Sequence, residues 1–457
     1  MTEMKALGAK VFTDRLGKTL IRVVSKPGSL RFRLARDTVG VMVIQAISMG
    51  LTFAVSVVLA RLLGVREFGL YSLAMSVLGL LVVPATLGFP QLLVREIAAY
   101  RVKGEFGLIR GILRFAQRTS LLASLAIALL GGLVLWVLSN YFSREAVRVL
   151  TLAFVALPFW ALLQLHGASL RGFEQILAGQ WVTTVMRPLG FLILVGVAWV
   201  LLGGLKDASL ALGLHIVAAG IALAFALYLL RSQLRCSIAS NVVSQNTAVW
   251  VHSVLSLAFM DLVGLIPQHA GILMLGWMRS AEEVGLYKVA YQISLLIPLS
   301  FSIVNTVFAP IVSRLFAEGN QRILRQLIIK VTIVSLLLAL PLVLLFLIKS
   351  SWLISTLFGK QFKESSGSLI ILTLSQLIYV ATGPLGLFLV MTRHERQLTF
   401  ASSIAWFSHV LLNLFLIPLY GINGVAISHA SSMTMFYVIT LYLYRRLSAL
   451  VNNDEKM

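Results

Sequence analysis

Two long apolar segments near the start of the chain constrain the fold most strongly. They cover residues 39–62 and 68–93, and a short polar elbow with Gly64, Arg66 and Glu67 separates them. Each is longer than the roughly 20 residues that a helix needs to cross a bilayer core of about 30 Å. We therefore expect the two segments to form a helical hairpin in a membrane.

The rest of the chain repeats this pattern, so we expect an all-α integral membrane protein with twelve transmembrane helices. After the hairpin, the predicted spans cover residues 120–138, 147–170, 177–202, 208–230, 249–278, 284–310, 331–347, 367–391, 398–419 and 422–444. Only 12% of the 457 residues are charged and 59% are hydrophobic, whereas soluble chains are about 25% charged.

The spans fall into two sets of six, which predicts five regions. These are a basic cytoplasmic amphipathic segment (1–38), an N-lobe of six helices (39–232), a cytoplasmic linker (233–248), a C-lobe of six helices (249–445) and a cytoplasmic tail (446–457). The first region lacks the apolar core and cleavage site of a signal peptide. Its apolar residues recur at helical spacing, which favours a helix on an anionic membrane surface; a disordered basic tail is the alternative.

The distribution of positive charge predicts the orientation. Most lysines and arginines lie in the two tails and in the even-numbered connections between spans. Basic residues of this kind collect on the cytoplasmic side, so both termini are predicted to be cytoplasmic, in the cytoplasmic (inner) membrane. The net charge of +21 is therefore spread along one side of a membrane, and we expect no nucleic-acid partner.

The two sets of spans also resemble each other. Gly69 and Tyr71 match Gly285 and Tyr287 at one constant offset, and each pair opens the second span of its set after an acidic turn. Six spans followed by six in the same orientation predict two parallel repeats around a central cleft, the geometry of alternating access. We expect the matching glycines and tyrosines to serve packing and interfacial anchoring.

Few ionisable residues lie deep within the spans, and such residues commonly face a cavity or a partner. Arg187, followed by Pro188, lies near the middle of the fifth span. It either binds an anionic substrate or pairs with a carbonyl group or with Asp261. Asp261 lies at mid-depth in the seventh span, with Gln268 seven residues on and therefore on the same helical face. Asp261 and Gln268 either bind a coupling H+ or Na+, or Asp261 neutralises Arg187.

Four further basic residues lie near the ends of the spans. Arg61 and Lys288 are predicted at the outer mouths, and Arg95 and Arg314 at the inner mouths. Together with Arg187 they are candidate substrate-binding residues that would follow an anionic headgroup across the membrane. The alternative is that each extends to the interface and anchors its helix.

Metal, cofactor and catalytic sites are not expected. Cys236 is the single cysteine, which excludes an internal disulfide and a thiolate metal cluster. No HExxH, P-loop or GxSxG motif is present. We therefore predict a non-enzymatic, monomeric transporter driven by an ion gradient, the membrane potential or the substrate gradient.

Several stretches resemble the polysaccharide transporter family, the O-antigen and exopolysaccharide flippases of the multidrug/oligosaccharidyl-lipid/polysaccharide exporter (MOP) superfamily. The most specific are residues 60–71 (ARLLGVREFGLY) and 93–98 (LVREIA); residues 283–287, 357–360 and 421–426 add weaker matches. The resemblance covers roughly residues 39–445. It implies a flippase for polyprenyl-diphosphate-linked oligosaccharides, with a central cationic cavity and membrane lipids around it, but it gives no residue-level site.

Two other functions are consistent with a membrane protein of this size. A multidrug or cation antiporter of the same superfamily would use several buried carboxylates, whereas only Asp261 is predicted deep in a span. A membrane glycosyltransferase or polymerase would need a large outer loop with carboxylates, and the longest predicted one, residues 349–366, contains Glu364 alone. The lipid-linked oligosaccharide flippase is the function that the sequence favours.

Overall fold

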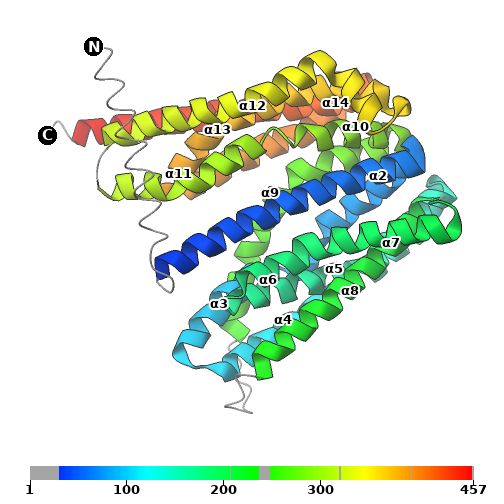
Figure 1. Ribbon diagram of the computed structural model, residues 1–457, viewed down its shortest axis with the longest axis horizontal. Coiled ribbons are helices and arrows are strands. Elements are labelled where there is room, and N and C mark those ends of the chain that lie inside the picture. The colour runs from blue at the N-terminus through cyan, green and yellow to red at the C-terminus, as the bar shows by residue number, and fades with distance from the viewer. Residues whose placement is uncertain (1–29, 206, 236–246, 319–320, 393, 455–457) are drawn as a thin grey trace.

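The computed structural model describes residues 30–205, 207–235, 247–318, 321–392 and 394–454, and every regular element in them is a helix (Figure 1). In chain order these are α2 (Leu30–Thr86), α3 (Phe89–Lys103), α4 (Phe106–Val137), η1 (Ser139–Tyr141), α5 (Arg144–Gly172), α6 (Ile176–Gln180), the π-helical η2 (Trp181–Met186), α7 (Arg187–Leu202), α8 (Ala208–Arg235), α9 (Thr247–Met278), α10 (Ala281–Ser294), α11 (Leu299–Ala317), α12 (Gln321–Leu357), η3 (Lys360–Ser365), α13 (Ser366–Met391) and α14 (Glu395–Asp454).

Nine helices in the described residues are long and apolar enough to cross a membrane, which confirms an all-helical membrane fold. The two longest of the nine, Val39–Thr86 and Glu395–Arg446, are each divided by a non-helical glycine. These residues are Gly64, with φ 78°, and Gly421, with φ 52°. Glycine adopts this left-handed backbone without the steric cost of a Cβ atom, so each long helix turns sharply where the sequence predicted an elbow.

The second predicted span is shorter than expected. It was predicted to reach residue 93, but α2 ends at Thr86, and Leu87 and Gly88 adopt positive φ before α3 begins. A Cβ atom on Gly88 would lie 2.6 Å from the backbone nitrogen of Ala258 in α9, so this break is fixed by a close contact with a distant helix. Pro90 favours the new helix start, because its missing N–H needs no partner there.

The basic stretch that was predicted as a connecting loop is mostly helical. The α3 helix continues to Lys103, α4 starts at Phe106, and Gly104 ends α3 in the left-handed conformation. Residues 1–29 of the predicted N-terminal segment and residues 236–246 of the predicted linker lie outside the described residues. Residues 446–454 of the predicted tail continue α14.

Two groups of helices lie on either side of α2 in Figure 1, with α3 to α8 on one side and α10 to α14 on the other. The α2 helix packs against α9 and α10. At this contact the two repeated glycines meet: a Cβ atom on Gly69 would lie 3.0 Å from the backbone nitrogen of Gly285, and one on Gly285 would lie 3.2 Å from that of Gly69. The matching glycines of the two halves thus pack against each other.

The start of α2 and the end of α14 lie at the same end of the helix bundle, on the left in Figure 1. We call this the tail end. The opposite end, which contains the turns at Gly64 and Gly421, is the elbow end.

Candidate functional site

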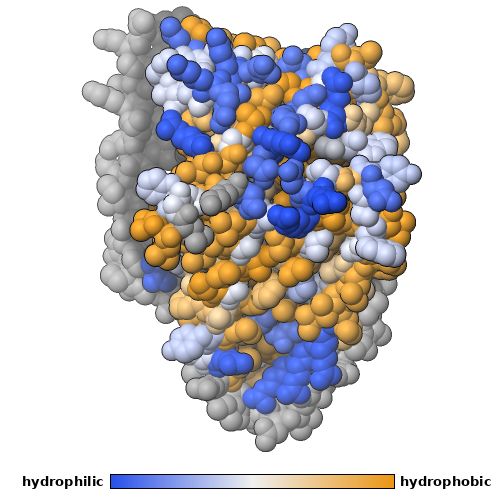
Figure 2. Space-filling model, turned by 90° about the vertical axis from the view of Figure 1, so that its right-hand side faces the viewer, coloured by the Kyte–Doolittle hydropathy of each residue, from blue (hydrophilic) through white to orange (hydrophobic). Residues whose placement is uncertain are grey.

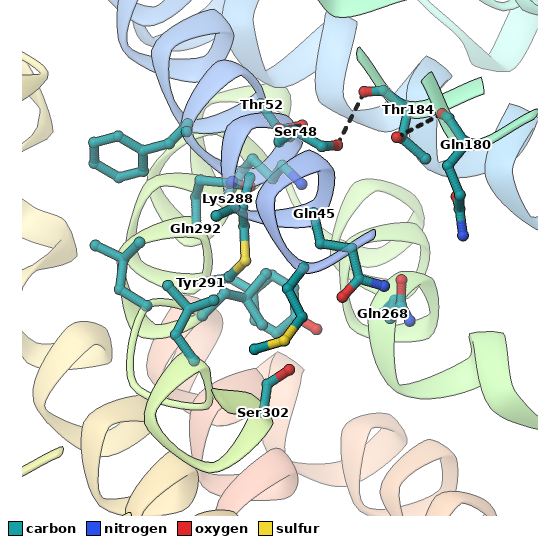
Figure 3. A pocket seen from close by; sticks show the side chains of 18 of the residues that line it. Gln45, Ser48, Thr52, Gln180, Thr184, Gln268, Lys288, Tyr291, Gln292 and Ser302 are labelled. Atoms are coloured by element: carbon teal, nitrogen blue, oxygen red, sulfur yellow. Dashed lines mark hydrogen bonds between the residues drawn. The ribbon is translucent and has the colours of Figure 1, made fainter. Parts of the chain in front are cut away.

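A cavity of about 700 Å³ lies between the two groups of helices (Figure 3). One wall is the first part of α2, from Met42 to Phe53, with two residues from the segment that follows α5. The opposite wall comes from α9, α10 and the start of α11. The polar residues that line it are mostly amides and hydroxyls: Gln45, Ser48, Thr52, Gln180, Thr184, Gln268, Tyr291, Gln292 and Ser302.

The N-terminal wall of the cavity is held together by hydrogen bonds (Figure 3). The hydroxyl of Ser48 on α2 donates to the carbonyl of Thr184 at 2.9 Å, and the Thr184 hydroxyl donates to the carbonyl of Gln180 at 2.8 Å. Thr184 belongs to the π-helical segment η2. Single π-helical turns in α-helices occur frequently at functional sites, and here the turn forms part of the cavity wall.

Lys288 is the lysine of the cavity and comes from α10 (Figure 3). Its ammonium lies 6.0 Å from the ring centre of Tyr291. Among the residues described as lining the cavity, none is an aspartate or a glutamate. A lysine ammonium offers three hydrogen-bond donors, and a weakly screened positive charge attracts anions. The lining can therefore bind a negatively charged group through Lys288 and hydroxyl-rich groups through the amides.

The structure brings together two of the seven predicted site residues, Lys288 and Gln268, in this cavity. The remaining five do not line it: Arg61, Arg95, Arg187, Asp261 and Arg314. The polar face of the first span was not predicted from the sequence, because its residues are uncharged. Gln45, Ser48 and Thr52 recur at helical spacing on an otherwise apolar segment, a pattern that could have revealed this face.

Arg61 joins the two halves at the elbow end. Its Nε donates to the carbonyl of Leu357 at 2.7 Å, and its guanidinium also donates to the carbonyl of Thr356. These carbonyls belong to the last turn of α12. The last carbonyl groups of a helix have no N–H partner within the helix and carry partial negative charge, so a cation stabilises them. Arg61 therefore caps a helix of the other half.

Further contacts close the elbow end. Arg66 pairs with Glu145 at 2.8 Å and with Glu282 of the other half at 3.6 Å. The rings of Phe68 and Phe362 meet edge to face, with centres 6.0 Å apart. Figure 2 looks onto this end, where hydrophilic residues gather between hydrophobic ones.

Arg95 and Arg314 each pair with a nearby glutamate on their own helix. Arg95 Nε lies 2.9 Å from Glu96, and Arg314 Nε lies 2.6 Å from Glu318. The hydrogen bond to Glu318 raises the pKa of Arg314 above its ordinary value. Ion pairs between exposed side chains contribute little to stability, because water and salt screen them. Both pairs are also local in the sequence, so neither joins the two halves.

Asp261 and Arg187 do not neutralise each other. Asp261 accepts a hydrogen bond of 2.5 Å from the side-chain amide of Gln91, which joins α9 to α3. Arg187 lies inside the N-terminal half, with its guanidinium carbon 4.5 Å from the ring centre of Trp160 on α5. The predicted alternative of an Arg187–Asp261 pair is therefore wrong.

The chain is similar to known polysaccharide biosynthesis proteins. The family described as "Polysaccharide biosynthesis protein" matches residues 34–316. The chain is 23% identical over 407 residues to the probable low-salt glycan biosynthesis flippase Agl15 of Haloferax volcanii, covering 89% of this chain and 82% of that protein. It is also 23% identical over 191 residues to the capsular polysaccharide biosynthesis protein CapF of Staphylococcus aureus, covering 42% and 48%.

Solved structures show the same fold. A multidrug resistance MATE family transporter of the MOP superfamily, in an inward-facing conformation, superposes with a TM-score of 0.70 at 13% identity and covers 90% of this chain and 99% of its own. The lipid II flippase MurJ, in an inward closed conformation, gives 0.68 at 16% identity and covers 89% and 87%. With the fold of these transporters and a family match over more than half of its length, the chain belongs to the polysaccharide biosynthesis protein family.

Proposed function

We propose that this protein is a flippase that moves polyprenyl-diphosphate-linked oligosaccharides across the cytoplasmic membrane for surface polysaccharide synthesis. The observation that carries the proposal is the cavity between the two halves. Its lining combines one lysine and one histidine, His269, with amides and hydroxyls and includes no acidic residue among those described. A diphosphate joined to a sugar chain requires this combination of a cation and many hydrogen-bonding groups. The relative Agl15 is itself named as a probable glycan flippase.

The proposed architecture is twelve transmembrane helices in two parallel repeats. The nine candidate spans support it when the two long helices are divided at Gly64 and Gly421 and the apolar helix α9 is counted. The meeting of Gly69 with Gly285 supports two equivalent halves. We place both termini in the cytoplasm from the distribution of basic residues, and we propose that the transporter acts as a monomer.

Transport proceeds by alternating access in this proposal. With the elbow end closed, the headgroup enters the cavity from the tail end, its diphosphate binds Lys288, and its sugar hydroxyls bind the amides. The polyprenyl tail stays in the lipid. The contacts of Arg61 with α12 and of Gly69 with Gly285 then separate, and the cavity opens on the other side. A gradient of H+ or Na+, the membrane potential or the substrate gradient supplies the driving force.

The second candidate is a cation or drug antiporter, because the chain shares its fold with a multidrug transporter. The charge of the cavity separates the two functions. A cationic drug would meet Lys288 rather than a carboxylate, and like charges repel strongly where water is scarce. We therefore favour the anionic lipid-linked substrate.

The test is flipping of a fluorescent lipid-linked diphospho-oligosaccharide in proteoliposomes, measured with a membrane-impermeant quencher. We expect Lys288→Gln to lower the initial rate at least about tenfold, because a hydrogen bond to a charged group contributes about 1.5–3 kcal/mol. Lys360→Gln, the same change at an exposed position of the elbow end, should flip at the wild-type rate.

Two results would contradict the proposal. If the Lys288→Gln variant flips the lipid as fast as the wild type, this cavity is not the headgroup site. Export of a cationic dye by wild-type proteoliposomes that do not flip the lipid would favour the antiporter.

A further inference from the structure

A second positively charged site lies inside the N-terminal half, apart from the cavity. Arg187 is the first residue of α7 and follows the π-helical segment directly. Its guanidinium carbon is 4.5 Å from the ring centre of Trp160, and the ring centre of His215, on α8, is 5.1 Å from that same tryptophan ring. None of these three residues lines the cavity. We call Arg187, Trp160 and His215 the Arg187 site.

Two nitrogen atoms in the Arg187 site are buried and have no hydrogen-bond partner among the described residues. They are Nε of Arg187 and Nε2 of His215. The other ring nitrogen of His215, Nδ1, lies 2.7 Å from the hydroxyl of Tyr71. When a neutral histidine accepts a hydrogen bond at Nδ1, its proton is on Nε2. The site then presents two unused N–H donors, and leaving buried donors unused costs free energy.

The positive charge of Arg187 also lacks a counter-charge in the part of the chain that the structure describes. No ion pair is formed there by Arg187, and the deep carboxylate of Asp261 is bound to Gln91 instead. Arginine stays protonated in proteins, and a charge within a membrane span is costly unless it faces a cavity or a partner. The face of Trp160 supplies only part of the compensation through a cation–π contact.

Aromatic rings surround the Arg187 site. Phe191 stacks on His215 with ring centres 4.3 Å apart, and Tyr71 stacks on Phe191 at 6.4 Å. Such rings cannot replace the large hydration shell of a phosphate. They suit a small anion that carries one charge and loses its water easily.

We propose that the Arg187 site binds a small inorganic monoanion of the halide class, such as chloride, held by the Arg187 guanidinium and Nε2 of His215. The anion supplies the missing acceptor for both donors and the missing negative charge. Because all three residues belong to the N-terminal half, the bound anion stays with that half and stabilises its interior. This binding is independent of the flippase function and can be measured without substrate.

The test uses the purified full-length protein in detergent, with bromide as the probe and gluconate keeping the ionic strength constant. Bromide quenches tryptophan fluorescence on contact, so binding beside Trp160 should give a saturable component of quenching that Trp160→Phe removes. We expect Arg187→Gln to raise the half-saturating bromide concentration at least tenfold. Lys288→Gln, the same type of change in the cavity, should leave the bromide response unchanged.

Several outcomes would overturn the proposal. One is a bromide response in Arg187→Gln that equals that of the wild type. Another is loss of the response in Lys288→Gln, which would place the halide in the cavity. A third is displacement of bromide by inorganic phosphate at equal concentration, which would exclude the monoanion class. If Arg187→Gln does not fold, anomalous diffraction from wild-type crystals soaked in bromide decides the question. A peak beside Arg187 and His215 supports the site, and its absence overturns it.

Discussion

At the scale of single residues, the carboxylate of Asp261 stands out because its partner is a neutral amide. Gln91 donates to it across the contact between α3 and α9. A hydrogen bond to an ionised carboxylate is stronger than one between neutral groups, but it leaves the negative charge uncompensated. This is the arrangement in which H+ or Na+ can bind without displacing an arginine, so we retain Asp261 and Gln268 as proposed ion-coupling residues.

We expect Asp261→Asn to change how the flipping rate responds to pH or to sodium, because asparagine keeps a hydrogen-bond acceptor for Gln91 but binds neither ion. The measurement is the initial flipping rate in proteoliposomes with imposed H+ or Na+ gradients. Asp207→Asn, at an exposed position near Arg148, is the matched control. A response identical to that of the wild type would leave Asp261 with a structural role only.

The sequence shows which charged residues fall within apolar segments, but it could not show the direction of their side chains. Arg187 and Lys288 both fall within apolar segments. Only the packing of neighbouring helices decides that Lys288 lines the cavity while Arg187 stacks on Trp160. A helical residue can face any side of its helix, and a span that is apolar all round gives no indication of which side.

At the scale of helices, the crossing of α2 and α10 is the principal contact that closes the elbow end. Gly69 and Gly285 allow the two backbones to touch, and small residues permit such close approach between helices in membranes. The Gly64 elbow was predicted from its polar residues. The break at Leu87 and Gly88 was not, because the apolar character continues through it and the cause is a contact with α9.

We expect Gly69→Leu to force α2 and α10 apart, to lower stability by roughly 1–3 kcal/mol through overpacking, and to stop flipping. Opening is measured by maleimide labelling of Phe68→Cys, a position only 1% exposed in the wild type, in a Cys236→Ser background. Gly132→Leu is the control, because no atom lies within 4 Å of a Cβ atom built there. Labelling that stays at the wild-type level would show that the crossing tolerates bulk and does not control access.

At the scale of the whole molecule, the start of the first described helix, α2, and the end of the last, α14, both lie at the tail end (Figure 1). An even number of spans requires this arrangement. The all-helical membrane fold and the family could be predicted from apolar segment length and the motifs near the elbow. A central cleft was also predicted, but most of the residues that line the cavity were not, because α2, η2, α9, α10 and α11 come together only when the halves assemble.

The proposed orientation predicts which positions are labelled in intact cells by a membrane-impermeant maleimide. In the Cys236→Ser background, Tyr141→Cys at the elbow end should react directly, and Val102→Cys at the tail end should react only after permeabilisation. Both side chains are more than four-fifths exposed, at 85% and 88%, so burial cannot account for a difference. The reverse pattern would place the termini outside the cell.

The contact between the two glycine backbones also has a consequence for the environments in which the protein can work. Exposed ion pairs weaken as ionic strength rises, because mobile ions screen them over a few ångströms. Dispersion forces between touching backbones do not depend on dissolved electrolyte. This backbone contact should therefore hold equally well in dilute medium and in brine, whereas the ion pairs of Arg66 beside it weaken as salt is added.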